Sequence, residues 1–189
     1  LRAMIPRLRE RGFERGFSQV PFSDSDFLLK KDVIERACDW ENYPSDVVDR
    51  AWPRFIGMDL AGEARPGTVI FTMAVSPNGR KYVVEIRRGN WGFGTEAARQ
   101  LVETWNIHKP ELIMVENVAA QQSTIDILKL IAAPWMPVKG YKTGREKSDY
   151  KIGIPGLFAQ IENGGWVFPM RQAADHRGKS CDCPYCVFL

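Results

Sequence analysis

The chain has 189 residues, which is enough for one domain with a proper core, or for one domain and a tail. Because 44% of its residues are apolar and 26% are charged, we expect a globular protein, and its longest apolar runs fall far short of the ~20 residues of a membrane span. A formal net charge of +3 excludes the global basic field that by itself marks a nucleic-acid binder. Any such binding must therefore come from a local patch.

The N-terminal residues and the cysteines indicate a reduced compartment. Residues 1–16 carry too many charges for a signal peptide. Three of the four cysteines crowd into the last nine residues while Cys38 stands far away, unlike the framework of a secreted disulfide protein. We therefore expect a cytoplasmic protein that has no membrane partner.

Residues 1–53 mix Arg-rich, Pro-containing and acidic pieces, and we interpret them as a linker or lead-in arm. They contain one short predicted helix, which Ser25 or Asp26 can cap. The apolar face of this helix is irregular and consists of Phe27, Leu28, Val33 and Ile34.

From Arg54 the pattern becomes regular. Strands are predicted at about 55–60, 68–75 and 80–87. The segment "SPNGR" supplies the turn between the last two strands, because Pro-Asn-Gly allows the φ values that a hairpin needs. These strands begin the predicted sheet.

Helices and strands then alternate. A helix is predicted from about Thr95 until just before Pro110, and "ELIMVEN" follows as a continuous apolar run typical of a strand covered on both faces. The remaining predicted elements are a helix at about 121–132, a strand near 136–139, a helix near 148–162 that stops at Gly164, and a last extended piece, "WVFP". The sequence therefore predicts an α/β fold, a mixed sheet with an antiparallel part and parallel strands, flanked by helices.

Two acidic residues end predicted strands, Asp59 the first and Glu116 the fourth. Neighbouring strands lie roughly 4.8 Å apart, so both carboxylates reach one edge of the sheet if these strands are adjacent and parallel. Two anions held so close repel each other, and a divalent cation between them removes the penalty. Oxygen ligands favour Mg²⁺ or Mn²⁺, and the small residues Gly57, Ala61 and Gly62 would leave room for the ion, water and a phosphate.

The ordinary alternative for an acid after a strand is a turn former or a helix cap, and periodicity alone leaves both interpretations open. The run "FIGMDLAGEARPGTVIFTMAVSPNGRKYVVEIRRGNW", followed by "ELIMVENVAAQQSTIDILK", resembles the nuclease domain of the large subunit of tailed-phage terminases. That domain belongs to the ribonuclease H-like, or retroviral-integrase-like, superfamily. The resemblance covers about residues 54–169. It implies a ribonuclease H-like nuclease domain at 54–170, a lead-in arm from a preceding ATPase domain at 1–53, and a Cys-rich tail at 171–189.

The resemblance also implies the site residues and the partners. In the family, an Asp on the first strand and an acid at the end of the fourth strand hold the catalytic metals, and these map to Asp59 and Glu116. The implied partners are double-stranded DNA, the terminase ATPase domain, the small terminase subunit and the portal, in the cytoplasm of the host cell.

The family's third carboxylate, an Asp on a helix after the last strand, has no clear counterpart in the sequence. Asp175 and Asp182 come late enough, but their Gly-, His- and Cys-rich surroundings do not predict a helix. We therefore expect the third acid beyond Leu189, which would make the chain a truncated gene product with impaired activity.

Basic residues gather in "KGYKTGREKSDYK", which begins with Lys139 in a predicted strand and runs into the next helix. Such clusters neutralise phosphates, although a solvated helix face is the alternative interpretation. Lys147 and Lys151 are four apart and so share one helical face, and the family shows a similar Lys and Arg pair there. The predicted DNA-binding residues are Lys142, Arg145, Lys147 and Lys151.

The C-terminal tail carries two further patterns. His176, Cys181, Cys183 and Cys186 have the ligand types and number of a tetrahedral Zn²⁺ site, but their spacing is tighter than in common zinc knuckles, and a terminus without zinc is the favoured interpretation. The segment "AADHRGKS" formally fits a relaxed phosphate-loop pattern. It is interpreted as a chance match, because Pro184 and the chain end leave no helix whose N-terminus could hold phosphates.

The first functional hypothesis is a two-metal-dependent DNA endonuclease, a terminase nuclease domain that cuts concatemeric double-stranded phage DNA during genome packaging. A Holliday-junction-resolvase-like nuclease of the same fold is the enzymatic alternative. From a different class, the missing third acid favours a catalytically impaired prophage module that binds DNA or acts in assembly.

Overall fold

The computed structural model describes residues 31–60, 67–92, 94–116, 122–141 and 154–176. In chain order these residues form α2 (Lys31–Ala37), β1 (Cys38–Asp39), α3 (Pro44–Val47), β2 (Arg54–Asp59), β3 (Thr68–Val75), β4 (Lys81–Gly89), α4 (Thr95–His108), β5 (Leu112–Glu116), α5 (Gln122–Ile131), β6 (Val138–Tyr141), α6 (Ile154–Glu162), β7 (Trp166–Pro169) and α7 (Arg171–Asp175).

The strands form one seven-stranded sheet in the order β1-β7-β4-β3-β2-β5-β6. β3 is antiparallel to both of its neighbours, and every other pairing in the sheet is parallel. The predicted mixed sheet, with three antiparallel strands and additional parallel ones, is therefore confirmed. Because only β3 runs in the opposite direction, the carboxyl ends of β2 and β5 meet at the same edge of the sheet.

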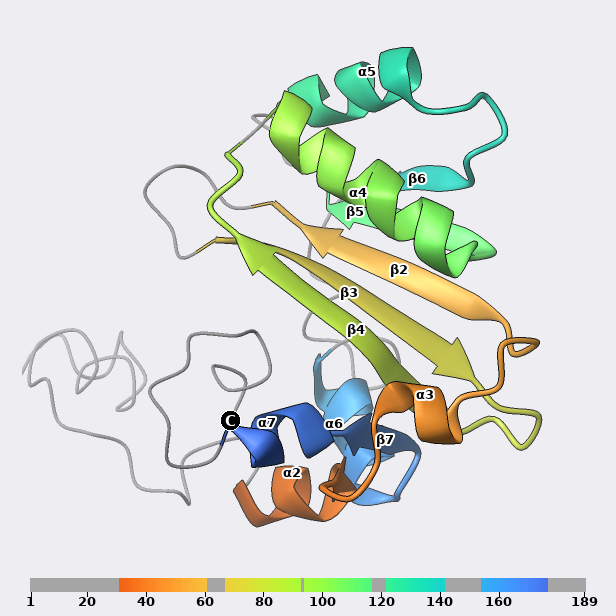
Figure 1. Cartoon of the computed structure of the whole chain (residues 1–189), viewed down its shortest axis with the longest axis vertical. Helices are drawn as coiled ribbons and strands as arrows, with labels where there is room; N and C mark the ends of the chain where they lie inside the picture. Colours follow the sequence, from red (N-terminus) through yellow and green to blue (C-terminus); the bar gives the residue numbers. More distant parts are fainter. Residues whose placement is uncertain (1–30, 61–66, 93, 117–121, 142–153, 177–189) are drawn as a thin grey trace, which may run out of the picture.

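One face of the sheet is covered by α4 and α5, which lie together above it in Figure 1. Alternate residues of β2, β3 and β5 point to this face, as expected for strands with one buried face. The core between the sheet and these helices is almost solvent-free. It includes Ile56, Met58, Ile70, Ala97, Ala98, Leu101, Ile113, Val115 and Leu128.

The opposite face has a second core, under the α2, α6 and α7 group at the bottom of Figure 1. It is centred on Trp166 and Phe168 of β7, whose rings stack at a centroid distance of 6.2 Å. The partly buried side chains of Val69, Phe71 and Met73 on β3 pack against this core. Successive residues of β3 thus serve two different cores.

The elements predicted from residue 54 onward are present within the described ranges, with small shifts at their ends. β6 begins at Val138 because Met136 closes a turn through a 2.9 Å backbone hydrogen bond to Ala133. α4 ends at His108, because the next residue, Lys109, has a left-handed φ of 46° and stops the helix just before Pro110.

The short helix α7 corrects one sequence-based expectation. The stretch that contains Asp175 was predicted not to be helical, yet Arg171–Asp175 forms one turn and a half of helix after the last strand. Local propensity gave no signal, because so short a helix is stabilised by packing rather than by its own residues. Here the packing comes from Met170 and Ala173, which are 0% and 6% exposed.

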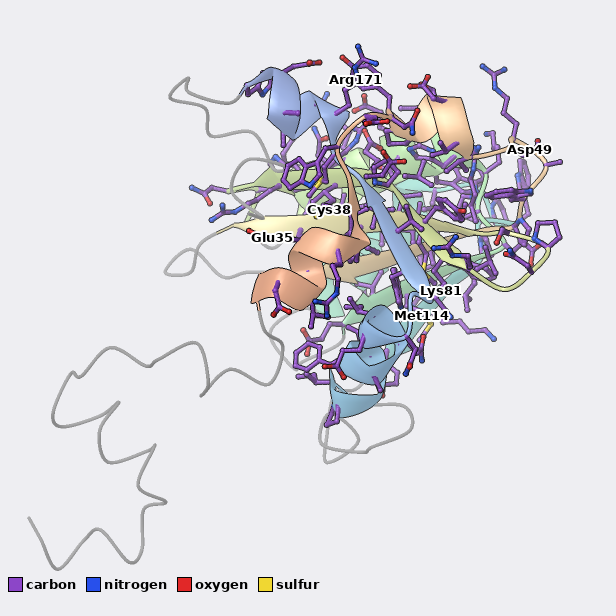
Figure 2. All side chains as sticks on the ribbon, turned by 90° about the horizontal axis from the view of Figure 1, so that it is seen from below. Glu35, Cys38, Asp49, Lys81, Met114 and Arg171 are labelled. Atoms are coloured by element: carbon purple, nitrogen blue, oxygen red, sulfur yellow. The ribbon has the colours of Figure 1, made fainter. Side chains whose placement is uncertain are left out.

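Part of the predicted lead-in arm lies against the sheet. β1 pairs with β7, with Cys38 opposite Phe168, and Val33 of α2 is buried in the second core. Figure 2 shows α2 alongside β7, with Glu35 and Cys38 near the junction of α2 and β1. The domain boundary at residue 54 stays a prediction, and the start of the helix predicted near Ser25 lies outside the described residues.

In the described part of the chain, no helix is both long and apolar enough to span a lipid bilayer.

Candidate functional site

The two predicted site acids end neighbouring parallel strands. β2 pairs with β5 from Phe55 opposite Leu112 through Met58 opposite Val115. Asp59 follows Met58 and Glu116 follows Val115, so the two acids stand at the next position of the same pairing. Strands in a sheet lie roughly 4.8 Å apart, and the structure therefore brings these two residues together.

The burial pattern places both acids on one face of the sheet. Met58 and Val115 are 3% and 0% exposed and point into the core under α4 and α5. Side chains alternate along a strand, so Asp59 and Glu116 project from the opposite face. Asp59 is exposed and Glu116 is half-buried. A pair of carboxylates in this position can present anionic oxygens to a common ligand.

The rung of the sheet that carries the acids continues onto three more strands. Asp59 lies opposite Val69 of β3, and Val69 lies opposite Arg88 of β4. On the other side, Glu116 is paired with Tyr141 of β6. Directly opposite residues share a face of the sheet. The acid rung, as we call this row, consists of Arg88, Val69, Asp59, Glu116 and Tyr141.

Gly57 leaves space beside Asp59 on the same face. A Cβ atom placed on Gly57 would meet no other heavy atom within 4 Å. Gly57 is two residues before Asp59, and side chains two apart in a strand share a face. This agrees with the predicted role of Gly57 in leaving room for a ligand, whereas Ala61 and Gly62 lie outside the described residues.

Most of the other predicted site residues are not among the described ones. Lys142, Arg145, Lys147 and Lys151 lie outside the described residues, as do Cys181, Cys183 and Cys186. Lys139 is described: it is exposed on β6 and paired with Met114, so it lies on the same face as Glu116. His176 directly follows α7.

Asp175, considered above as a late acid, lies on α7 and accepts a hydrogen bond from the hydroxyl of Tyr43. This hydrogen bond raises the pKa of Tyr43. Over the described residues, no three His, Cys, Asp or Glu side chains gather into a group suited to a metal ion. Asp175 therefore does not join Asp59 and Glu116 in this structure, and Asp182 lies outside the described residues.

A second charged cluster, which no local sequence pattern predicts, lies under α4 on the other face of the sheet. His108 Nε2 is 2.7 Å from Glu85 Oε2, and Glu85 also accepts a 3.0 Å hydrogen bond from Arg87 Nε. Burial alone would raise the pKa of Glu85, but the hydrogen bond from His108 and the charge of Arg87 hold this pKa below its ordinary value. Strand alternation separates this structural cluster from the acid rung, because Glu85 and Arg87 face α4 while Arg88 faces away.

The strand order and the position of the acid pair define a class of fold. A central antiparallel trio, β4-β3-β2, extended by parallel β5 and β6 with helices on both faces, is the ribonuclease H-like arrangement that the sequence predicted. The solved structures with the same arrangement include nuclease domains of phage large terminases.

The nuclease domain of the large terminase subunit gp2 of bacterial virus Sf6 superposes with a TM-score of 0.54 at 9% identity, over 75% of this chain and 73% of that one. A mutant of the same domain with manganese and beta-thujaplicinol gives 0.52 at 9% identity, with the same coverage. The large terminase nuclease from thermophilic phage G20c gives 0.51 at 12% identity over 64% of this chain. This chain spans 60% of the length of the G20c nuclease.

These likenesses show the fold. No protein-family model and no curated protein matches the sequence. The resemblance to terminase nuclease domains, first seen in the two strand-end acids and the hairpin between them, is thus confirmed at the level of three-dimensional structure.

Proposed function

We propose that this chain contains a metal-dependent DNA endonuclease domain, of the kind found in the large subunit of phage terminases, which cuts concatemeric double-stranded DNA during genome packaging. The observation that carries the proposal is the shared position of Asp59 and Glu116 at the ends of the paired strands β2 and β5. The fold of the Sf6 and G20c nuclease domains supports it.

Asp59 and Glu116 would hold the metal. Both are hard oxygen donors, which suits Mg²⁺ or Mn²⁺, and the Sf6 domain has been solved with manganese. Both acids follow strand residues that are almost completely buried, so the backbone under them is held in place by the core. Gly57 keeps the adjacent surface open to a phosphate. A bound divalent ion would supply an activated water and neutralise charge on the leaving oxygen.

The DNA partner would need cations near these acids. The segment from Lys142 to Lys151 continues directly from β6, whose last residue, Tyr141, is paired with Glu116. Lys139 adds an exposed cation on the same face. We propose this segment as a DNA contact, with the terminase ATPase domain, the small subunit and the portal as further partners in the host cytoplasm.

A non-catalytic DNA-binding or assembly module is the second candidate. It is favoured by one observation, that no third carboxylate accompanies Asp59 and Glu116 among the described residues. Two carboxylates can retain one ion but position a second one poorly, and a misplacement of ~1 Å can cost on the order of a hundredfold in rate.

The deciding experiment is loss of supercoiled plasmid in Mn²⁺ and in Mg²⁺, with this chain, with Asp59→Ala and with Glu111→Gln. Glu111 is a matched acid at the opposite end of β5, exposed and outside the acid rung. We expect slow nicking or linearisation by the chain and by Glu111→Gln, faster in Mn²⁺, and none by Asp59→Ala. If the unaltered chain and Asp59→Ala cleave plasmid at equal rates, the endonuclease proposal is rejected. The non-catalytic DNA-binding or assembly module is then the function that remains. A four-way DNA junction cut in preference to linear duplex would replace the terminase role by that of a junction resolvase.

A further inference from the structure

Arg88 stands at one end of the acid rung. It lies opposite Val69, which in turn lies opposite Asp59. Two strand spacings therefore separate the Cα atoms of Arg88 and Asp59, roughly 10 Å in all. Val69 between them is partly buried and packs against the second core. The guanidinium of Arg88 and the carboxylate of Asp59 therefore rise from one face with an apolar residue between them.

Arg88 and its neighbour Arg87 lie on opposite faces of the sheet, and in the described part of the chain only Arg87 is paired with acidic side chains. Arg87 is 19% exposed and paired with Glu85 at 3.0 Å and with Glu103 at 3.5 Å, on the face under α4. Arg88 is exposed, and among the residues that the structure describes its side chain has no hydrogen bond and no ion pair. The base of its side chain lies close to the backbone of Gly67, where an added Cβ would be 3.3 Å from Arg88 Cγ. The first carbons of the Arg88 side chain thus lie beside Gly67, and the guanidinium is available to an external anion.

A nucleic acid that reaches the acid pair has an electrostatic difficulty. Two carboxylates at one edge repel every phosphate except the one next to a bound cation, because like charges at close range disfavour each other. An arginine two strands away offsets this repulsion, and its planar guanidinium matches a phosphate in bidentate geometry. On the described part of this face, Arg88 lies on one side of the acid pair and Lys139 on the other.

We propose that Arg88 binds the DNA phosphate next to the one held at Asp59 and Glu116, so that the DNA strand crosses the sheet along the acid rung. This inference rests on the proposed endonuclease function. The Cα atoms of Arg88 and Asp59 are two strand spacings apart, roughly 10 Å, and this separation suits a contact with a phosphate next to the one at the acid pair. Arg88 is therefore a substrate-binding residue that adds one phosphate contact beside the acid pair.

The test measures duplex DNA binding by fluorescence anisotropy in Ca²⁺ over a range of salt concentrations, for the parent chain, Arg88→Ala, Arg88→Lys and a control. The control is Arg99→Ala, which removes the same charge from an arginine that is 68% exposed on α4, over the other face. We expect Arg88→Ala to bind about tenfold more weakly and to lower the slope of log affinity against log salt by about 1, the signature of one lost phosphate contact. Arg88→Lys should keep the slope but lose part of the affinity, because lysine cannot bind in bidentate geometry.

The inference is overturned if the slope of log affinity against log salt in Arg88→Ala equals that of the parent chain. It is also overturned if Arg99→Ala lowers this slope as much as Arg88→Ala does. Mn²⁺ binding should be unchanged in Arg88→Ala, and a loss there would show that Arg88 acts through the fold. If Arg88→Ala lowers the unfolding temperature, Arg88→Gln takes its place with the same expectations. The variant Asp59→Asn separates the two proposals. If Asp59→Asn cleaves DNA at the parental rate, the endonuclease proposal is rejected. If Asp59→Asn loses cleavage but Arg88→Ala binds DNA as the parent does, only the proposed role of Arg88 is rejected.

Discussion

Met58 lies directly opposite Val115 in the parallel pairing of β2 with β5, and both are buried in the core under α4 and α5. This pairing sets the position of the next residue on each strand, which is an acid in both cases. A register shifted by one residue would move one acid to the other face of the sheet, because side chains alternate with a period of two. The buried pair, Met58 and Val115, therefore holds the two acids in register.

Removal of either acid should weaken metal binding. We expect Asp59→Asn and Glu116→Gln each to bind Mn²⁺ about tenfold more weakly or worse, since each change removes an anionic oxygen ligand. Isothermal titration calorimetry of the three proteins would measure this, with Glu111→Gln as the control that keeps the total charge change equal. If both site variants bind Mn²⁺ as the parent does, the acids end their strands as turn residues only.

A side chain at position 57 should block the site without harming the fold. Gly57 has open space over it, and valine favours a strand more than glycine does. We expect Gly57→Val to unfold at an equal or higher temperature, with a gain of up to about 1 kcal/mol. Plasmid cleavage should fall strongly in Gly57→Val and less in Gly57→Ala, in proportion to the volume added. Full activity of Gly57→Val would show that the substrate does not approach over β2.

The Glu85 and His108 pair should make stability fall in acid. The pKa of Glu85 is lower in the folded chain than its ordinary value of 4.5, so its contribution to stability is fully present well above pH 4.5 and is lost as the pH falls through the lower, folded pKa. Urea unfolding at several pH values between about 3 and 6 would measure the slope. Glu85→Gln should flatten that slope and Glu111→Gln should leave it unchanged. If Glu85→Gln leaves the pH dependence of the unfolding free energy unchanged, other carboxylates cause the loss of stability in acid.

The core under α4 should be sensitive to the loss of a single side chain. Leu101 is 0% exposed, and we expect Leu101→Ala to lower the free energy of unfolding by about 2–5 kcal/mol, through lost burial and the cavity that remains. Leu130 of α5 is 84% exposed, and the same substitution there should change the free energy by less than about 0.5 kcal/mol. Similar costs at both positions would show that α4 does not form the main core.

The sequence by itself determined the local elements from residue 54 onward and the candidate acids. The apolar run of β2, the hairpin turn before β4 and the helical spacing of α4 are local signals, so they could be read without knowledge of any long-range contact. The same holds for the placement of Asp59 and Glu116 at strand ends. The fold class followed from the order of these elements and from the resemblance that the acids carry.

Only the tertiary structure decided which strands are neighbours and in which register. The pairing of β2 with β5 joins residues that are far apart along the chain, and so do the pairings of β7 with β4 and β1. Local propensity also gave no signal for α7, which depends on buried contacts of Met170 and Ala173. The position of Arg88 on the acid rung, and of Arg87 under α4, required the full register across β2, β3 and β4. Register is set by non-local packing of buried side chains, and a single sequence carries little information about it.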